Sequence, residues 1–164
     1  MAYLLDANVF IQAKNLHYGF DFCPAFWDWL AAQNQGGQVF SIEKVEDELV
    51  GLGDDLSQWA QRVGARFFLR PDADLIPALR QVALWASGRT YEPAAVRLFL
   101  QVADSYLIAH ALAHGDVVVT HEVSSASTKK IKIPDACLGL GVKCMTPFQM
   151  LQTERALFML GKRA

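Results

Sequence analysis

Short apolar segments alternate with amphipathic helical segments along the chain, and this alternation most restricts the fold. Four segments have the composition of short buried strands: residues 2–5, 38–41, 116–120 and 142–145. Helical segments with one apolar face lie between them, most clearly at residues 72–86. Strands that alternate with helices are typical of a parallel sheet covered on both faces. We therefore predict an α/β fold, a three-layer α/β/α sandwich with a mainly parallel central sheet.

Further helices complete the predicted pattern. The segment 93–114 is strongly helical, and we expect two pieces that meet near Ala103 and Asp104. A short helix after Asn8 is expected to use this residue as its N-cap. The other predicted helices are 25–33, 41–50, 55–62 and 147–160. No internal repeat or low-complexity linker divides the sequence, so we predict a single domain over residues 1–164.

Composition excludes several classes of protein. The apolar fraction of 52% and the ten Phe residues exclude general disorder. No stretch approaches the roughly 20 apolar residues that span a bilayer, and no basic start precedes an apolar run, so we expect no membrane segment and no signal peptide. The three cysteines, Cys23, Cys137 and Cys144, suit buried thiols in a reducing cytoplasm better than a disulfide framework. We predict a cytoplasmic protein.

The charge pattern restricts how the chain can meet a nucleic acid. Proteins that bind nucleic acid irrespective of its sequence usually carry a basic excess, whereas the net charge here is −2. Any contact with a phosphate backbone must therefore be local. The clearest basic cluster is Lys129, Lys130 and Lys132. A solvated loop explains this cluster equally well when it is taken alone.

Acidic residues stand at positions where parallel sheets bind ligands, beyond the carboxyl ends of the strands. Asp6 directly follows the first strand, and Glu122 follows the strand that ends near Thr120. Asp104 interrupts an apolar helical stretch and lies beside its buried face. Glu48 belongs to an acidic helix surface. Plainer explanations exist, because Asp6 and Asp104 suit helix caps and Glu48 suits a solvated surface, whereas Glu122 in a loop after a strand favours neither explanation.

A cluster of these acids would need a cation. Carboxylates that converge away from water repel one another and are costly to desolvate. Ligation by oxygen alone favours Mg²⁺ or Mn²⁺. Such an ion orients an attacking water and stabilises charge on a phosphodiester. The acids therefore indicate phosphodiester hydrolysis, a reaction that needs no His or Cys here.

Three segments together resemble the PIN-domain family, over nearly the whole chain. Residues 3–11 resemble the family's first motif, a strand that runs into Asp6, Ala7 and Asn8. Residues 45–49 resemble its second motif, a helix with an acid, and residues 103–112 match its third. The sequence departs from the family where a fourth strand commonly ends in Thr-x-Asp, because residues 120–122 read Thr-His-Glu. This layout is similar to a less-studied PIN-like subgroup.

The resemblance implies roles for individual residues. Asp6, Glu48 and Asp104 would hold Mg²⁺ or Mn²⁺, and Glu122 or Asp135 would complete the site. Supporting hydrogen bonds would come from Asn8, Ser105 and Thr120. The basic residues Lys129, Lys130 and Lys132 would meet the nucleic-acid backbone.

The resemblance also implies a metal-dependent endoribonuclease similar to the VapC toxins of toxin–antitoxin pairs. Its expected partners are the RNA substrate, a small protein antitoxin and a second copy in a homodimer. Four tryptophans offer apolar faces for such partners, although core packing is their commoner role: Trp27, Trp29, Trp59 and Trp85.

Two other functions compete with this interpretation. A PIN-like module that binds RNA or protein without cleavage is one, although such a module needs no clustered negative charge. A phosphatase of the haloacid dehalogenase type is the other, because it also begins with a strand into Asp. That family requires a second Asp two residues later, where this chain has Asn8, so we exclude it.

Overall fold

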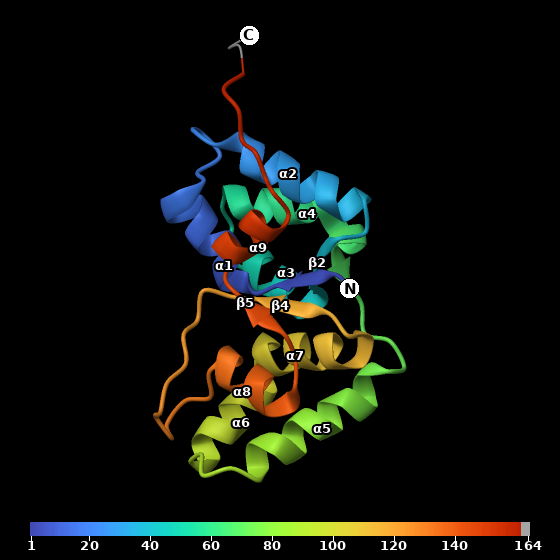
Figure 1. The fold of residues 1–164 in the computed structure, drawn as a ribbon, viewed down its shortest axis with the longest axis vertical. Coiled ribbons are helices and arrows are strands. Elements are labelled where there is room, and N and C mark those ends of the chain that lie inside the picture. Colours follow the sequence, from blue (N-terminus) through green and yellow to red (C-terminus); the bar gives the residue numbers. More distant parts are fainter. Residues whose placement is uncertain (162–164) are drawn as a thin grey trace.

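A computed structural model describes residues 1–161 as a parallel sheet between two layers of helices (Figure 1). The sheet has five strands in the order β3-β2-β1-β4-β5, and every neighbouring pair is parallel. The strands are β1 (Tyr3–Leu5), β2 (Val39–Ile42), β3 (Phe68–Leu69), β4 (Val117–Val119) and β5 (Cys144–Met145). The predicted α/β class and parallel sheet are confirmed.

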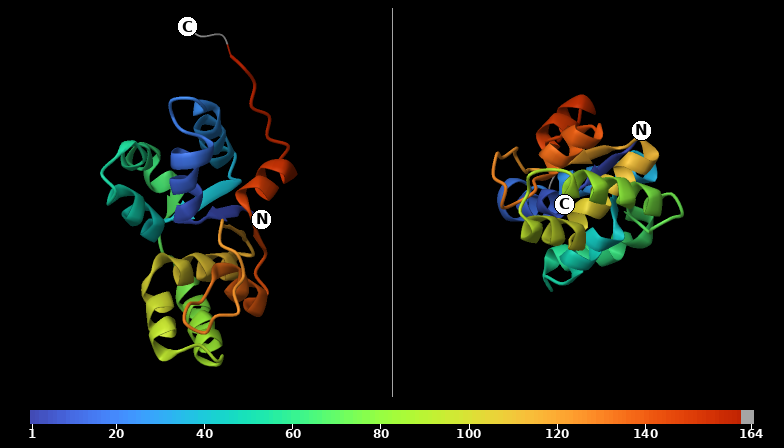
Figure 2. Two further views of the ribbon diagram at one scale, coloured as in Figure 1. Left: turned by 90° about the vertical axis from the view of Figure 1, so that its left-hand side faces the viewer. Right: turned by 90° about the horizontal axis from the view of Figure 1, so that it is seen from below.

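Helices cover both faces of this sheet, as the two further views also show (Figure 2). Helices α1, α2, α4 and α9 lie on one side, and α5 to α8 lie on the other. The helices are α1 (Ala7–Gln12), the π-helix η1 (Ala13–His17), α2 (Pro24–Gln35), α3 (Glu43–Val50), α4 (Asp55–Phe67), α5 (Leu75–Ser87), α6 (Pro93–Gln101), α7 (Ala103–His114), α8 (Ile133–Leu140) and α9 (Pro147–Thr153). The three-layer arrangement is thereby confirmed. Within residues 1–161, the helices lack the combination of length and apolar character that crossing a bilayer requires.

The register of the central strands brings their following residues together. Leu5 in β1 pairs with Val119 in β4, so both strands end at the same level. The backbone N–H of Asp6 donates to the carbonyl oxygen of Val119 at 2.9 Å. Because parallel strands point the same way, Asp6 and Thr120 lie next to each other at the carboxyl ends of β1 and β4.

Aromatic side chains fill the core on the α1 side of the sheet. The ring of Phe10 lies 5.6 Å from Trp59 and 5.9 Å from Phe67, between ring centroids. Trp27 packs edge-on against Trp59 at 5.0 Å. Trp27 and Trp59 are both buried, so their predicted alternative role as contact faces for a partner is wrong. Trp29 remains half-buried, as does Trp85.

The long helical segment is divided as expected. Helix α6 ends at Gln101 and α7 begins at Ala103, with Val102 between them in an extended conformation (ψ 172°). Asp104 therefore stands in the first turn of α7, where the helix dipole favours a negative charge. Asp104 is not the N-cap, because Val102 holds that position.

Several predicted boundaries differ from the structure, among them those of α1, α4 and α9, and neither strand β3 nor helix α8 is predicted. Helix α1 begins at Ala7 with Asp6 at its N-cap, so Asn8 lies inside the helix and its predicted capping role is wrong. Helix α9 ends at Thr153 rather than at residue 160, because the chain turns at Glu154 and Arg155 has a positive φ of 52°. Helix α8 is not predicted by the sequence pattern. Its eight residues begin at Ile133, just before Pro134, and are too few for a clear period.

Candidate metal centre

Four acidic side chains from four separate segments line one cavity of about 350 Å³. Asp6 follows β1, Glu48 lies on α3, Asp104 lies on α7, and Glu122 lies in the loop after β4. We call this space the acid cavity. Its other lining residues are Ala7, Asn8, Ile11, Ala95, Leu98, Phe99, Val102, Lys129, Lys130 and Ile131.

Asp6 is the most enclosed of these acids, with 6% of its surface exposed. It stands at the N-cap of α1, yet its side chain makes no capping hydrogen bond. The hydroxyl of Thr120 instead donates to Asp6 Oδ2 at 2.8 Å. Burial, followed by repulsion from Asp104, raises the pKa of Asp6 from 3.8 to about 7, against the lowering effect of the Thr120 hydrogen bond. The plain capping explanation therefore does not account for this residue.

Asp104 faces the same cavity from the opposite layer of helices. Burial raises the pKa of its carboxyl from 3.8 to about 6, and the charges of Glu122 and Glu48 contribute to this rise. Lys130 and Lys132 act in the other direction and lower the pKa of Asp104. The charges of Asp104 and Glu122 also contribute to the raised pKa of Asp6, so the acids of the cavity interact electrostatically.

The two glutamates reach the cavity from less enclosed positions. Burial raises the pKa of Glu48, although Lys44 on the same helix lowers it. Glu122 is held at the start of α8, where its Oε2 accepts a hydrogen bond from the backbone N–H of Ile133 at 2.8 Å. The Nζ atoms of Lys130 and Lys132 each lie 4.0 Å from Glu122 Oε1.

Thr120 and Asn8 connect the ends of β1 and β4 by a small hydrogen-bond network. The Asn8 side-chain amide donates to the Thr120 hydroxyl oxygen at 3.2 Å and accepts from the backbone N–H of His121 at 3.1 Å. The backbone N–H of Glu122 donates to the same hydroxyl oxygen at 3.1 Å. Thr120 therefore positions Asp6 and Glu122 together, which fits the supporting role expected of Asn8 and Thr120.

Four predicted site residues do not line the acid cavity: Thr120 and Lys132 contact residues that do, whereas Ser105 and Asp135 serve other purposes. Ser105 is fully buried, and its hydroxyl donates to the carbonyl oxygen of Val102 at 3.3 Å, so it stabilises the start of α7. Asp135 accepts a hydrogen bond from the backbone N–H of Ser125 at 3.0 Å and lines a different cavity beside Trp85. Of the two candidates for the fourth acid, the structure places Glu122 with the others.

The predicted basic residues border the acid cavity. Lys129 and Lys130 line it, and Lys132 reaches Glu122 from the same loop. This arrangement places local positive charge next to the acids in a chain whose net charge is −2. A phosphate group at this place would be attracted by the lysines and repelled by the acids unless a cation neutralises them.

The carboxylates of the acid cavity suit a hard divalent cation, but their spacing limits how many of them can bind it directly. Carboxylate oxygens are the ligands that Mg²⁺ and Mn²⁺ prefer. Within residues 1–161, the oxygens of the acid cavity do not form a group of three that lie within 4.8 Å of one another. Mg²⁺ commonly keeps several water ligands and uses only one or two carboxylates directly, so this spacing suits a partly hydrated ion.

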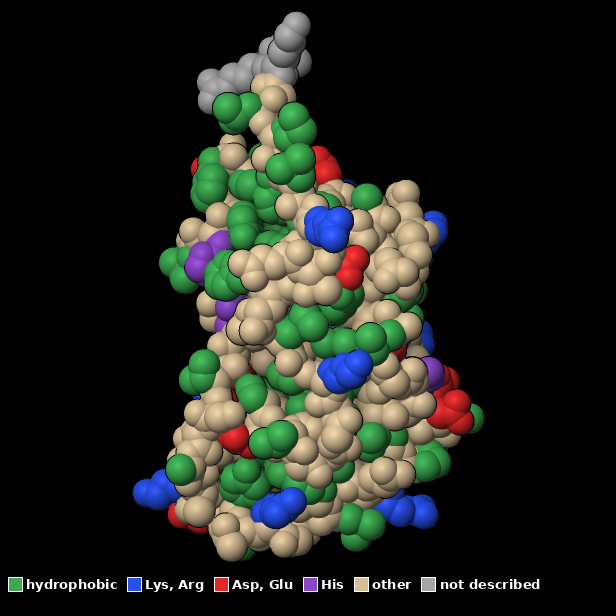
Figure 3. Space-filling model, in the orientation of Figure 1, with side chains coloured by type: hydrophobic (Ala, Val, Ile, Leu, Met, Phe, Trp, Pro, Cys, Tyr) green, Lys and Arg blue, Asp and Glu red, His purple; other side chains and the backbone are tan. Residues whose placement is uncertain are grey.

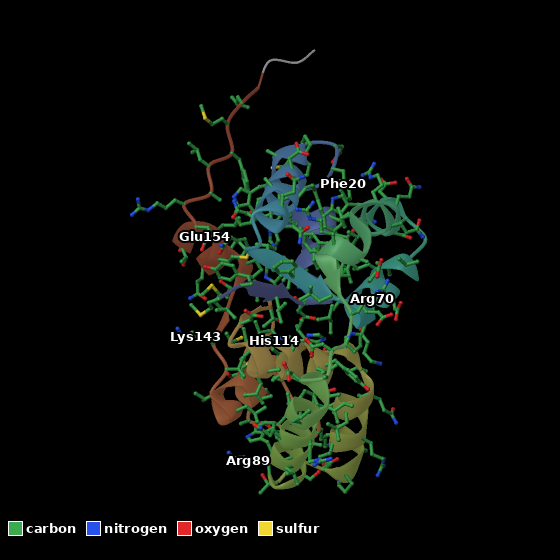
Figure 4. All side chains as sticks on the ribbon, turned by 90° about the vertical axis from the view of Figure 1, so that its right-hand side faces the viewer. Phe20, Arg70, Arg89, His114, Lys143 and Glu154 are labelled. Carbon is green, nitrogen blue, oxygen red and sulfur yellow. The ribbon has the colours of Figure 1, made fainter. Side chains whose placement is uncertain are left out.

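One group that the sequence pattern does not reveal does meet the 4.8 Å spacing. Asp72, Asp74 and His114 bring their ligand atoms within that distance, and all three are exposed. His114 Nε2 and Asp72 Oδ2 lie 2.8 Å apart, as an ion pair requires. Figure 4, which looks at the right-hand side of Figure 1, labels His114. His114 is the last residue of α7, whereas Asp104 lies in the first turn of this helix. This ion pair is separate from the acid cavity, and only the fold brings its members together.

The apolar wall of the acid cavity is a second feature that sequence reasoning misses. Ile11 on α1 and Leu98 and Phe99 on α6 line the cavity beside the acids. Leu98 is 55% exposed, so part of this apolar wall is open to solvent. The amphipathic pattern of α6 is the signal available in the sequence, but it does not show which face borders the cavity.

Comparison with known proteins identifies the family of this chain. No curated protein matches it, and no solved structure does. A family model described as "Domain of unknown function (DUF4411)" matches residues 3–158, which include every residue of the acid cavity. The chain therefore belongs to the DUF4411 family.

Proposed function

We propose that this protein is a metal-dependent endoribonuclease that hydrolyses phosphodiester bonds in the acid cavity. One observation carries the proposal. Asp6, Glu48, Asp104 and Glu122 come from four separate segments and line a single cavity that lysines border. Buried carboxylates cost stability unless a cation neutralises them, and the raised pKa values of Asp6 and Asp104 show that this cost is present.

The residues of the chain would divide the work as follows. Asp6 and Asp104 face each other across the cavity and would hold Mg²⁺ or Mn²⁺, with Glu48 and Glu122 binding directly or through water. When bound, the ion orients the attacking water and stabilises the charge that develops on the phosphate. Thr120 keeps Asp6 Oδ2 in place by its hydrogen bond, so this carboxylate is oriented before any ligand arrives.

The lysines would position the substrate. Lys129 and Lys130 line the cavity, and Lys132 lies 4.0 Å from Glu122. Lysine side chains that border a nuclease site hold phosphate oxygens and offset the repulsion between the substrate and the acids. A basic patch of this size supports local contact with a few phosphates, in agreement with the low net charge.

The choice of RNA and of a biological role rests on the resemblance to PIN-domain proteins. We propose a VapC-like toxin that acts in the cytoplasm, where its three free cysteines would stay reduced. Its partners would be a protein antitoxin that covers the acid cavity and a second copy of the chain in a homodimer. The neighbouring reading frame would encode a small protein if this role is correct.

A comparison of four matched variants tests the enzymatic proposal. Asp6→Asn and Asp104→Asn should abolish Mn²⁺-stimulated cleavage of a labelled RNA, because each removes a charge from the acid cavity. Glu122→Gln should weaken cleavage, whereas Asp135→Asn makes a related change outside the cavity and should leave it unchanged. Circular dichroism would verify that each variant is folded. Cleavage by Asp6→Asn at the wild-type rate, or cleavage without metal, would contradict the proposal.

The same assay addresses the alternative of a module that binds RNA without cleaving it. A binding module would retain RNA in a filter assay and show no turnover with Mg²⁺ or Mn²⁺. No observation within residues 1–161 favours that alternative over hydrolysis, because a cavity with four acids repels a polyanion unless a cation is present.

A further inference from the structure

Three aromatic rings from separate segments gather beside the acid cavity. His17 ends η1, His121 follows β4 by two residues, and Phe148 lies near the start of α9. The ring centroids are 5.5 Å apart for the two histidines, 5.2 Å for His17 and Phe148, and 5.5 Å for His121 and Phe148. Each ring thus contacts the other two. We call His17, His121 and Phe148 the aromatic cluster.

This cluster is accessible to a ligand. Phe148 is 42% exposed, and both histidines are half-buried rather than enclosed. Figure 3 shows histidine side chains next to hydrophobic ones on the left-hand side of the molecule, over α1 and α9. The protein covers part of each ring. The exposed remainder of the ring surfaces is available to another planar group.

The aromatic cluster adjoins the acid cavity through the backbone of His121. The backbone N–H of His121 donates to Asn8 Oδ1 at 3.1 Å, and Asn8 lines the acid cavity. The next residue, Glu122, lines it as well. A flexible polymer that binds with one phosphate at the acids could therefore place an adjacent part of itself against the rings.

Nucleic acid strands supply units of the required shape. Unpaired bases stack on Phe and His rings, and any base can do so because every base has a flat face. Bases inside a duplex have both faces covered by their neighbours. We propose that the aromatic cluster is a subsite that stacks one unpaired base of the strand whose phosphodiester lies in the acid cavity. This inference rests on the proposed function, since it assumes a nucleic acid in that cavity.

Binding without cleavage tests the subsite directly. The probe is a fluorescently labelled single-stranded RNA of ten nucleotides, and the protein carries Asp104→Asn so that the RNA remains intact. Anisotropy would compare this protein with versions that add Phe148→Ala, His17→Ala or Phe148→Tyr. Phe22→Ala is the matched control, because Phe22 is 67% exposed and lies outside the aromatic cluster.

The expected result is specific to stacking. Phe148→Ala should weaken RNA affinity about tenfold, His17→Ala should weaken it less, and Phe148→Tyr should restore it. An RNA with one abasic position should bind the protein with an intact aromatic cluster about as weakly as normal RNA binds Phe148→Ala. The same abasic RNA should bind Phe148→Ala no more weakly than normal RNA does. Equal affinity for all versions, or equal affinity for a duplex of the same length, would overturn the subsite.

Other outcomes separate this inference from the proposed function. If the wild-type protein cleaves RNA and Phe148→Ala binds RNA normally, the subsite is wrong and the enzyme proposal stands. If RNA binding depends on Phe148 but no metal supports cleavage, the subsite stands and the enzyme proposal is wrong. If Phe148→Ala instead dissociates a dimer in analytical ultracentrifugation while RNA affinity is unchanged, a second copy covers the rings and the subsite is overturned.

Discussion

The hydroxyl of Thr120 donates a hydrogen bond of 2.8 Å to Asp6 Oδ2, and this contact joins the ends of β1 and β4. The same oxygen accepts hydrogen bonds from the Asn8 amide and from the backbone N–H of Glu122. One buried hydroxyl therefore helps to set the positions of two of the four acids. Removal of this hydroxyl should disturb both of them.

Thr120→Val should destabilise the protein and raise the pKa of Asp6 above its value of about 7. The substitution keeps the volume but removes three hydrogen bonds around a buried carboxyl, so we expect a loss of about 1–3 kcal/mol in the free energy of unfolding. Urea denaturation would measure the loss. Thr153→Val is the control, because its exposed hydroxyl bonds only the carbonyl oxygen of Gln149. Equal stability of both variants would contradict the bridging role of Thr120.

The metal-free protein should become less stable as the pH rises from about 4 to about 7. The pKa of Asp6 is raised from 3.8 to about 7 and that of Asp104 to about 6, so in this range the unfolded chain releases protons that the folded chain keeps. The stabilisation is complete below pH 3.8 and is lost as the pH passes the folded values.

Asp6→Asn should flatten this pH dependence, because the amide does not ionise. At about 1.4 kcal/mol for each pKa unit, the variant should gain a few kcal/mol over the wild type at pH 8 and little at pH 4. Denaturant titrations at both pH values, without metal, would measure the difference. Asp135→Asn should show the same pH dependence of the free energy of unfolding as the wild type. If Asp6→Asn also showed the wild-type pH dependence, the pKa of Asp6 would not be raised by burial.

Lys130→Ala combined with Lys132→Ala should affect metal and RNA in opposite ways. Both lysines lower the pKa of Asp104, so their removal makes the acid cavity more negative and should strengthen Mn²⁺ binding in calorimetry at pH 8. RNA affinity should fall, and the slope of its logarithm against salt should decrease by about 0.7 for each phosphate that the lysines no longer neutralise. Lys143→Ala is the control, because Lys143 (labelled in Figure 4) lines a different cavity together with Met1 and Asp116. Unchanged RNA affinity would exclude these lysines from the substrate site.

Gly139→Ala should destabilise the fold although it replaces glycine inside a helix. Alanine is favoured in helices by about 1 kcal/mol over glycine. A Cβ atom at Gly139 would nevertheless lie 2.1 Å from Trp85 Nε1, which is buried against this glycine. We expect the clash to exceed the helical gain and cost about 1–2 kcal/mol. Gly36→Ala, with its nearest atom 3.6 Å away, is the control in the same denaturation experiment.

The positions of four of the five strands and of most helices could be predicted from local patterns, whereas β3 has only two residues and is not predicted as a strand. Apolar runs such as residues 117–119 and the break near Val102 are visible without a structure, because each depends on neighbouring residues. Helix α8 could not be predicted, since its eight residues are too few for a clear period. The end of α9 also differs, because the turn at Arg155 overrides the helical composition that follows it.

The sequence by itself determined that strands alternate with helices and that acids follow two of the strands, since both properties are local. Only the tertiary structure decided that Glu122, rather than Asp135, joins Asp6 and Asp104 at one cavity. It also decided that Trp27 and Trp59 pack inside the protein and that His17, His121 and Phe148 meet at its surface. The physical reason is that burial and charge repulsion depend on distances between segments remote in sequence, and strand register sets those distances.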